Sequence, residues 1–174
     1  MVFVGFNPGL TSGRTGHYYA HPSNRFWHLL AAAGLTARRY GPEEDYLLPQ
    51  LGYGFTDLVR RMSRTSQELK GSELTDGARE VRKHLRTFRP AIAAFTGKGV
   101  AAAVTGRACG YGWLDEEVEA GVHGLVLTSP SGLAAQSSAR RLAPYLELSE
   151  AVLALRAGRL PTGWRPIAEA RSRC

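Results

Sequence analysis

Three short apolar runs that carry no charge constrain what this chain can fold into. They are Val2–Phe6, Ala91–Thr96 and Gly124–Thr128. Such runs predict strands buried on both faces, which occur in parallel sheets covered by helices. Segments with helical spacing separate the runs, so we expect an α/β fold with a central, mostly parallel sheet. In such folds the chemistry lies at the carboxyl ends of the strands.

Helices are expected where apolar spacing agrees with residues that begin or end a helix. Ser23 can cap a helix over Asn24–Ala33, which Gly34 ends. Pro144 suits a first helical position, so the last helix is predicted to run from there to Ala157. The other predicted helices cover Glu43–Leu48, a segment capped by Ser72 that runs to about Phe88, and Val100–Val104.

The remaining segments are predicted as loops and short strands. Gly54–Val59 is either a short strand or irregular, and Arg60–Gly71 is loop-like. Tyr111–Trp113 and Glu117–Val122 are expected to pair with the strand at Gly124–Thr128. We interpret residues 1–157 as one domain and residues 158–174 as an arginine-rich extension.

The charge balance points to an anionic partner. The chain has 22 Lys and Arg against 15 Asp and Glu, a formal net charge of +7, and arginine dominates the basic residues. Arginine makes bidentate contacts with phosphate, so nucleic acid is the first candidate. Cys109 and Cys174 form no disulfide framework, and we expect neither a membrane span nor a signal peptide. A monomer in the cytoplasm, associated with the nucleoid if the source is bacterial, is expected.

Two loops follow predicted strands and carry residues suited to chemistry. In the first, which spans Asn7–Pro22, Asn7 can orient a water but cannot act as a strong base. Tyr18 and Tyr19 offer flat faces on which a base can stack. In the second loop, SPSGLAAQSS, hydroxyls suit a phosphate contact and an apolar residue can act as a wedge. The residues concerned there are Ser129, Ser131, Gly132 and Leu133.

These loops resemble a known family. The stretch GFNPGLTSGRTGHYYAHPSNRFW, Gly5–Trp27, looks like the first signature of the mismatch-specific uracil-DNA glycosylases, and SPSGL resembles the second. The segment AIAAFTGKGVAAAV resembles the strand and helix between them, so the similarity runs from Val2 to roughly Arg156. It implies a single three-layer α/β/α domain, no metal and no cofactor.

The resemblance also implies roles for individual residues. Asn7 matches the asparagine that orients the attacking water, and Tyr19 matches an aromatic that stacks on the flipped base. The backbone of Phe6 and Tyr19 would read the uracil edge, and Ser12 matches a position near the target sugar-phosphate. Gly132 and Leu133 match the wedge. Two positions depart from the pattern: Ser129 stands where asparagine is frequent, and Ala135 where a basic residue is frequent.

The implied function is repair of double-stranded DNA that contains uracil mismatches. We expect a slow, monofunctional hydrolase that flips uracil out, preferably from U·G pairs, and leaves an abasic site. A neutral amide at residue 7 suffices because the amide positions water without deprotonating it.

Three alternatives use other features. The stretch TGKGVAA imitates the turn of a nucleotide-cofactor domain, with Glu117 or Glu119 about twenty residues further on. A non-catalytic nucleic-acid-binding domain would share the basic charge. His17 and His21 are four residues apart, but the loop has no nearby acidic partner, so a metal hydrolase is not expected. We expect His21 to brace the loop by a buried hydrogen bond.

Overall fold

The predicted parallel sheet is present in the computed structural model, which describes residues 1–132, 138–162 and 164. Five strands lie in the order β2-β1-β3-β5-β4. The three central pairings are parallel and β4 pairs antiparallel with β5. The strands are β1 (Val2–Gly5), β2 (Gly54–Asp57), β3 (Ile92–Phe95), β4 (Gly112–Trp113) and β5 (His123–Val126).

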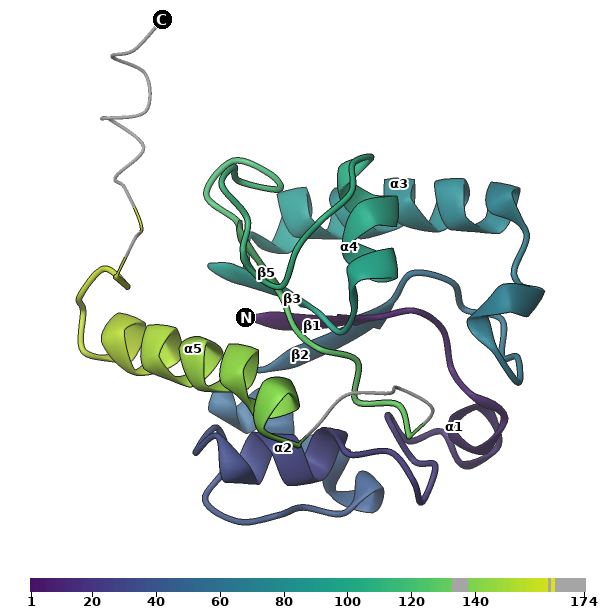
Figure 1. The fold of residues 1–174 in the computed structure, drawn as a ribbon, viewed down its shortest axis with the longest axis horizontal. Coiled ribbons are helices and arrows are strands. Elements are labelled where there is room, and N and C mark those ends of the chain that lie inside the picture. The colour runs from purple at the N-terminus through teal and green to yellow at the C-terminus, as the bar shows by residue number, and fades with distance from the viewer. Residues whose placement is uncertain (133–137, 163, 165–174) are drawn as a thin grey trace, which may run out of the picture.

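Helices cover both faces of the sheet, which confirms the α/β/α architecture (Figure 1). One face carries α2 (Phe26–Ala32) and α5 (Ser138–Arg156), and the other carries α3 (Gly71–Phe88) and α4 (Lys98–Thr105). The strands alternate as their pleat requires. On β1, Phe3 packs in the cluster with α2 and α5, while Val4 packs in the cluster with α3 and α4.

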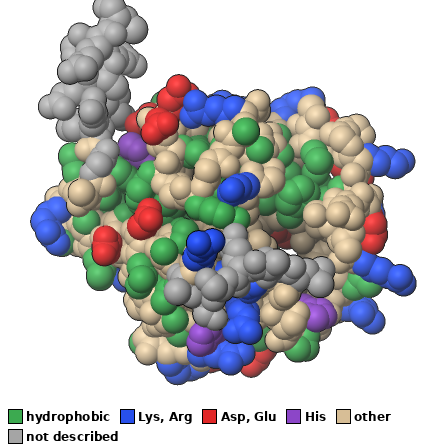
Figure 2. Space-filling model, viewed as in Figure 1, with side chains coloured by type: hydrophobic (Ala, Val, Ile, Leu, Met, Phe, Trp, Pro, Cys, Tyr) green, Lys and Arg blue, Asp and Glu red, His purple; other side chains and the backbone are tan. Residues whose placement is uncertain are grey.

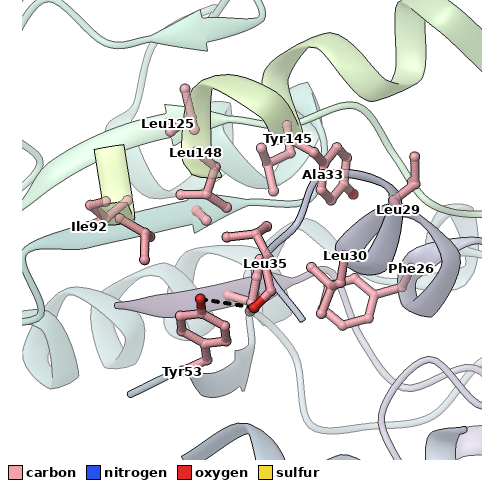
Figure 3. Packing of buried hydrophobic residues seen from close by; sticks show 14 of the residues in the cluster. Phe26, Leu29, Leu30, Ala33, Leu35, Tyr53, Ile92, Leu125, Tyr145 and Leu148 are labelled. Carbon is pink, nitrogen blue, oxygen red and sulfur yellow. Dashed lines mark hydrogen bonds between the residues drawn. The ribbon is translucent and has the colours of Figure 1, made fainter. Parts of the chain in front are cut away.

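The core beneath α2 and α5 also fixes the loop that follows β5 (Figure 3). Tyr145 is fully buried, and its hydroxyl donates to the carbonyl of Thr128 at 3.1 Å. The Thr128 hydroxyl in turn donates to the carbonyl of Arg141 at 2.7 Å. Both bonds join α5 to the start of the second candidate loop.

The described segment past α5 contributes to the same core. Trp164 stacks on the His123 ring, with centroids 3.7 Å apart, and meets Trp113 edge-on at 5.5 Å. The domain boundary between residues 157 and 158 stays a prediction. No helix in the described parts of the chain has the length and apolar character that crossing a membrane requires.

Several predicted elements differ from those observed. The first loop contains a short helix, α1 (Leu10–Thr15), which buries no residue and so shows no apolar stripe in the sequence. The expected helix at Glu43–Leu48 is a 3-10 helix, η1 (Pro42–Leu51), and Ser66–Glu68 forms a second, η2. Asn24 accepts the N–H of Phe26 at 2.9 Å, so α2 begins two residues later than predicted.

Two further differences concern the start of α5 and the segment Glu117–Val122. α5 begins at Ser138, six residues before Pro144, so this proline lies inside the helix and not at its first position. Glu117–Val122 is not a strand, since Gly121 turns the chain with φ of 76°. A single antiparallel bridge between Glu119 and Val122 closes that turn.

The buried hydroxyl of Tyr145 makes the tie between α5 and the second loop testable. Tyr145→Phe leaves the Thr128 carbonyl without this donor, so unfolding should require about 1 kcal/mol less free energy. Urea unfolding followed by circular dichroism measures the change. Tyr46→Phe is the matched control because the Tyr46 side chain is 64% exposed. Equal loss in both variants would contradict the assignment.

Candidate active site at the carboxyl ends of the strands

Asn7 follows β1 directly, and its amide orientation is fixed by its neighbours. The side-chain nitrogen donates to the carbonyls of Pro8 at 3.1 Å and Arg61 at 3.0 Å, and to the hydroxyl of Ser63 at 2.8 Å. A carbonyl oxygen only accepts hydrogen bonds, so nitrogen must be the atom that faces these groups. The amide oxygen accepts no hydrogen bond from the described residues and is the end that can hold a water.

Tyr19 lies over the ends of β1 and β3 in a strained backbone conformation. Its φ is 54°, in the left-handed region that residues other than glycine rarely adopt. The ring stacks on Phe26 with centroids 3.9 Å apart, and its hydroxyl lies 3.4 Å from the hydroxyl of Thr96. Burial raises the pKa of the Tyr19 phenol well above its usual value, so the group stays neutral.

Ser12 holds the turn that carries Tyr19. Its hydroxyl oxygen accepts the N–H of Ala20 at 3.0 Å. The other side of the turn is held by Asp45, whose carboxylate accepts the N–H of Tyr18 at 3.1 Å. The same carboxylate lies 3.3 Å from Nδ1 of His17, so this histidine has an acidic neighbour that the local sequence did not reveal. The turn is thus fixed by side chains rather than by regular structure.

The backbone N–H groups of Phe6 and Tyr19 make no hydrogen bond within the described part of the chain, although the Phe6 carbonyl accepts from Val59 at 2.9 Å. The Phe6 ring packs beside Gly99 in the first turn of α4, on the face of the sheet that carries α3 and α4. Both donors are therefore available to a ligand's oxygen atoms. This geometry fits the backbone roles that the resemblance implies, which stay predictions.

Asp57 is a member of this cluster that the sequence did not single out. It ends β2 opposite Gly5, and a Cβ at Gly5 would overlap its carboxyl oxygen and come within 3.3 Å of the Tyr19 hydroxyl. Burial raises the pKa of the Asp57 carboxyl to about 7. A carboxyl of this kind can give or take a proton near neutral pH. The signal available in the sequence was one acidic residue at the end of the segment GFTD.

The second loop lies against the first. The N–H of Arg25 donates to the carbonyl of Pro130 at 2.8 Å, and a Cβ at Gly132 would overlap the Ser23 hydroxyl. The Ser129 hydroxyl accepts the N–H of Ser131 at 3.3 Å. Ser129 and Ser131 are thus brought to the edge that carries Asn7 and Tyr19. Leu133, the predicted wedge, lies outside the described residues.

His21 braces its loop, but it is exposed, so the expectation of a buried hydrogen bond was wrong. Its Nδ1 lies 2.8 Å from the Ser23 hydroxyl and accepts the N–H of Ser23 at 3.2 Å. These partners sit within two residues of the ring, which lets a local turn satisfy it at the surface.

A pocket of about 260 Å³ opens beside the turn that carries Tyr19. Tyr19, His21, Trp27 and Tyr40 are among its lining residues, and Asn7 is not. Lys98 is exposed at the start of α4, with Nζ 4.4 Å from the centre of the Tyr111 ring. Figure 2 shows Lys and Arg side chains both along the outline of the visible face and within it.

Comparison with protein families agrees with this geometry. A model of the uracil DNA glycosylase superfamily matches residues 1–153. The chain belongs to that superfamily. The matched residues include both loops. Membership of this superfamily makes the protein a DNA glycosylase, a hydrolase that acts in DNA repair. This membership favours the glycosylase reading over a nucleotide-cofactor domain or a non-catalytic binding domain.

The raised pKa of Asp57 gives a pH-dependent stability. The folded protein keeps this proton up to about pH 7, whereas the unfolded chain loses it near its ordinary value of 3.8. Folding is therefore penalised progressively as pH rises through that window. Asp57→Asn is neutral at every pH, so its stability relative to the parent should improve by about 2 kcal/mol between pH 5 and pH 8.

Urea unfolding at the two pH values measures this difference, with Asp76→Asn as the control for an aspartate whose side chain is 68% exposed. A difference between Asp57→Asn and the parent that stays constant with pH would show that burial does not perturb Asp57.

Proposed function

We propose that this protein is a monofunctional uracil-DNA glycosylase that prefers uracil opposite guanine, acting as a monomer on double-stranded DNA. The observation that carries the proposal is the Asn7 side chain, whose nitrogen is held by three acceptors and whose oxygen is left for a water. The superfamily match supports the reaction class. The mismatch preference rests on the signatures around Asn7 and Ser129 and on the physics of base flipping.

Access to the glycosidic bond requires that the nucleotide leaves the stack. Flipping costs a few kcal/mol and costs least at a mismatch, so a U·G pair opens more readily than U·A. We assign Gly132 and Leu133 to the wedge that fills the gap, and Ser12, Ser129 and Ser131 to contacts with the sugar-phosphate. Tyr19 offers a ring for the extruded base, supported from behind by Phe26.

Bond cleavage then separates charge. Uracil leaves as an anion, and hydrogen-bond donors near its oxygens would stabilise the charge. The backbone N–H groups of Phe6 and Tyr19, which have no partner among the described residues, can act as these donors. The sugar becomes cation-like, so the water needs positioning more than deprotonation. The Asn7 oxygen accepts a hydrogen bond from that water, and this bond turns a lone pair of the water's oxygen toward the sugar.

No step through a lysine is proposed. Lys98 stands at the start of α4, directly after the turn that follows β3. Its Nζ lies 4.4 Å from the centre of the Tyr111 ring. This cation–π contact supports a mechanism without a Schiff-base step at Lys98. The expected products are free uracil and an intact abasic strand.

Asn7→Ala tests the catalytic assignment. Removing the water-positioning oxygen should slow single-turnover release of uracil from U·G duplex by at least about a hundredfold. Melting temperature and affinity for abasic duplex are measured alongside, because both should be largely retained. A rate close to that of the parent, with the fold intact, would remove Asn7 from catalysis.

The substrate preference is tested separately with duplexes that contain U·G, U·A or T·G and with single-stranded uracil. Release from U·G should exceed release from U·A by about tenfold or more, since the mismatch lowers the flipping cost by about 1.4 kcal/mol or more. Strand breaks should appear only after alkali. Equal rates on U·G and U·A would contradict the mismatch preference. Strand breaks without alkali would contradict the monofunctional assignment.

A further inference from the structure

We propose that Ser63 is a positioning residue that, together with the Pro8 and Arg61 carbonyls, sets which end of the Asn7 amide meets the water; this inference rests on the proposed function. Ser63 lies 56 residues after Asn7 and is only 3% exposed. Its hydroxyl oxygen is the closest of the three acceptors of the Asn7 nitrogen, at 2.8 Å, and is the only one supplied by a side chain.

The Ser63 hydroxyl is itself oriented so that it can only accept from Asn7. It donates its proton to the carbonyl of Thr65 at 2.7 Å, which turns the oxygen lone pairs toward the amide nitrogen. The N–H of Ser63 donates to the carbonyl of Pro8 at 3.2 Å, so the backbone of Ser63 is joined to the Asn7-Pro8 turn as well. A buried hydroxyl with both roles satisfied holds its partner strongly.

The loop that carries Ser63 is clamped to the start of α3. The Arg61 guanidinium makes two bonds to the Glu73 carboxylate, at 2.8 and 3.0 Å, and one to the Glu68 carbonyl at 3.0 Å. The Glu73 carboxylate also accepts the N–H of Lys70 at 2.9 Å. Because the Arg61 carbonyl is another acceptor for Asn7, this clamp anchors the residue that supplies it, two positions before Ser63.

The chemical consequence follows from the symmetry of an amide side chain. An amide rotated by half a turn would offer its nitrogen to the water and face its oxygen toward carbonyl oxygens, which repel it. A nitrogen donor cannot accept the proton of an attacking water. Ser63 acts on the reaction only through Asn7, and this distinguishes it from a residue that merely stabilises the loop.

Single-turnover uracil release from U·G duplex tests the proposal. Ser63→Ala should slow the step by about tenfold while affinity for abasic duplex stays the same, and Ser63→Thr, which restores a hydroxyl, should recover most of the rate. Ser63→Cys, a similar volume with a weaker acceptor, should be intermediate. Ser149→Ala is the matched control, since Ser149 is a buried serine on α5 and is 7% exposed.

Two readouts separate positioning from loop stability. In an Asn7→Ala background, Ser63→Ala should change the rate no further. In ¹⁵N-labelled protein the Asn7 side-chain amide signals, assigned by their loss in Asn7→Ala, should shift and exchange faster with solvent in Ser63→Ala but not in Ser149→Ala.

The outcomes distinguish this inference from the proposed function. If the parent protein releases no base from any duplex, the proposed function fails, and the amide signals still report whether Ser63 holds Asn7. If the parent releases uracil and Ser63→Ala releases it at the same rate, the positioning role is overturned. It is also overturned if Asn7→Ala and Ser63→Ala together slow release by the product of their separate effects. Unchanged Asn7 amide signals in Ser63→Ala overturn it as well.

Discussion

The hydrogen bonds of one amide nitrogen organise this molecule's functional edge. Asn7 stands at the end of the first strand, and the groups that hold it include Arg61 and Ser63, more than fifty residues later in the chain. The parallel pairing of β1 with β2 makes this possible, because it delivers both strand ends to the same edge. Backbone bonds from Leu58 and Val59 to Gly5 and Phe6, both at 2.9 Å, continue that pairing past the last strand residues.

The second constraint is the contact between the two loops. Gly132 fits against Ser23 only because it has no side chain, and Arg25 donates to Pro130 beside it. Tyr145 and Thr128 fix the start of the same loop from within the core. The second loop is thus held from two directions, by the first loop and by α5. A site assembled in this way depends on the whole sheet, since no single segment contains it.

The sequence was informative about the fold because buried strands leave a simple record. The runs at Val2, Ala91 and Gly124 contain no polar interruption, and all three form parallel strands. Elements that bury little leave no such record, so the sequence predicts a loop where α1 forms. The start of α5 differs from the prediction because Pro144 is a local signal for a first helical position, whereas the helix holds it in its interior. Among the site residues, Asn7 and Tyr19 stand in a distinctive motif, but Ser63 and Asp57 stand in ordinary ones, and only the paired strand ends bring them together.

The absence of a side chain at residue 5 has a consequence for how this edge can vary. Any Cβ there would overlap the carboxyl of Asp57, so the two positions share one volume. A larger residue at position 5 therefore requires the Asp57 carboxyl to move, or a smaller side chain at position 57. Substitutions at residues 5 and 57 are therefore expected to depend on each other, because both side chains would occupy the same space at this edge of the sheet.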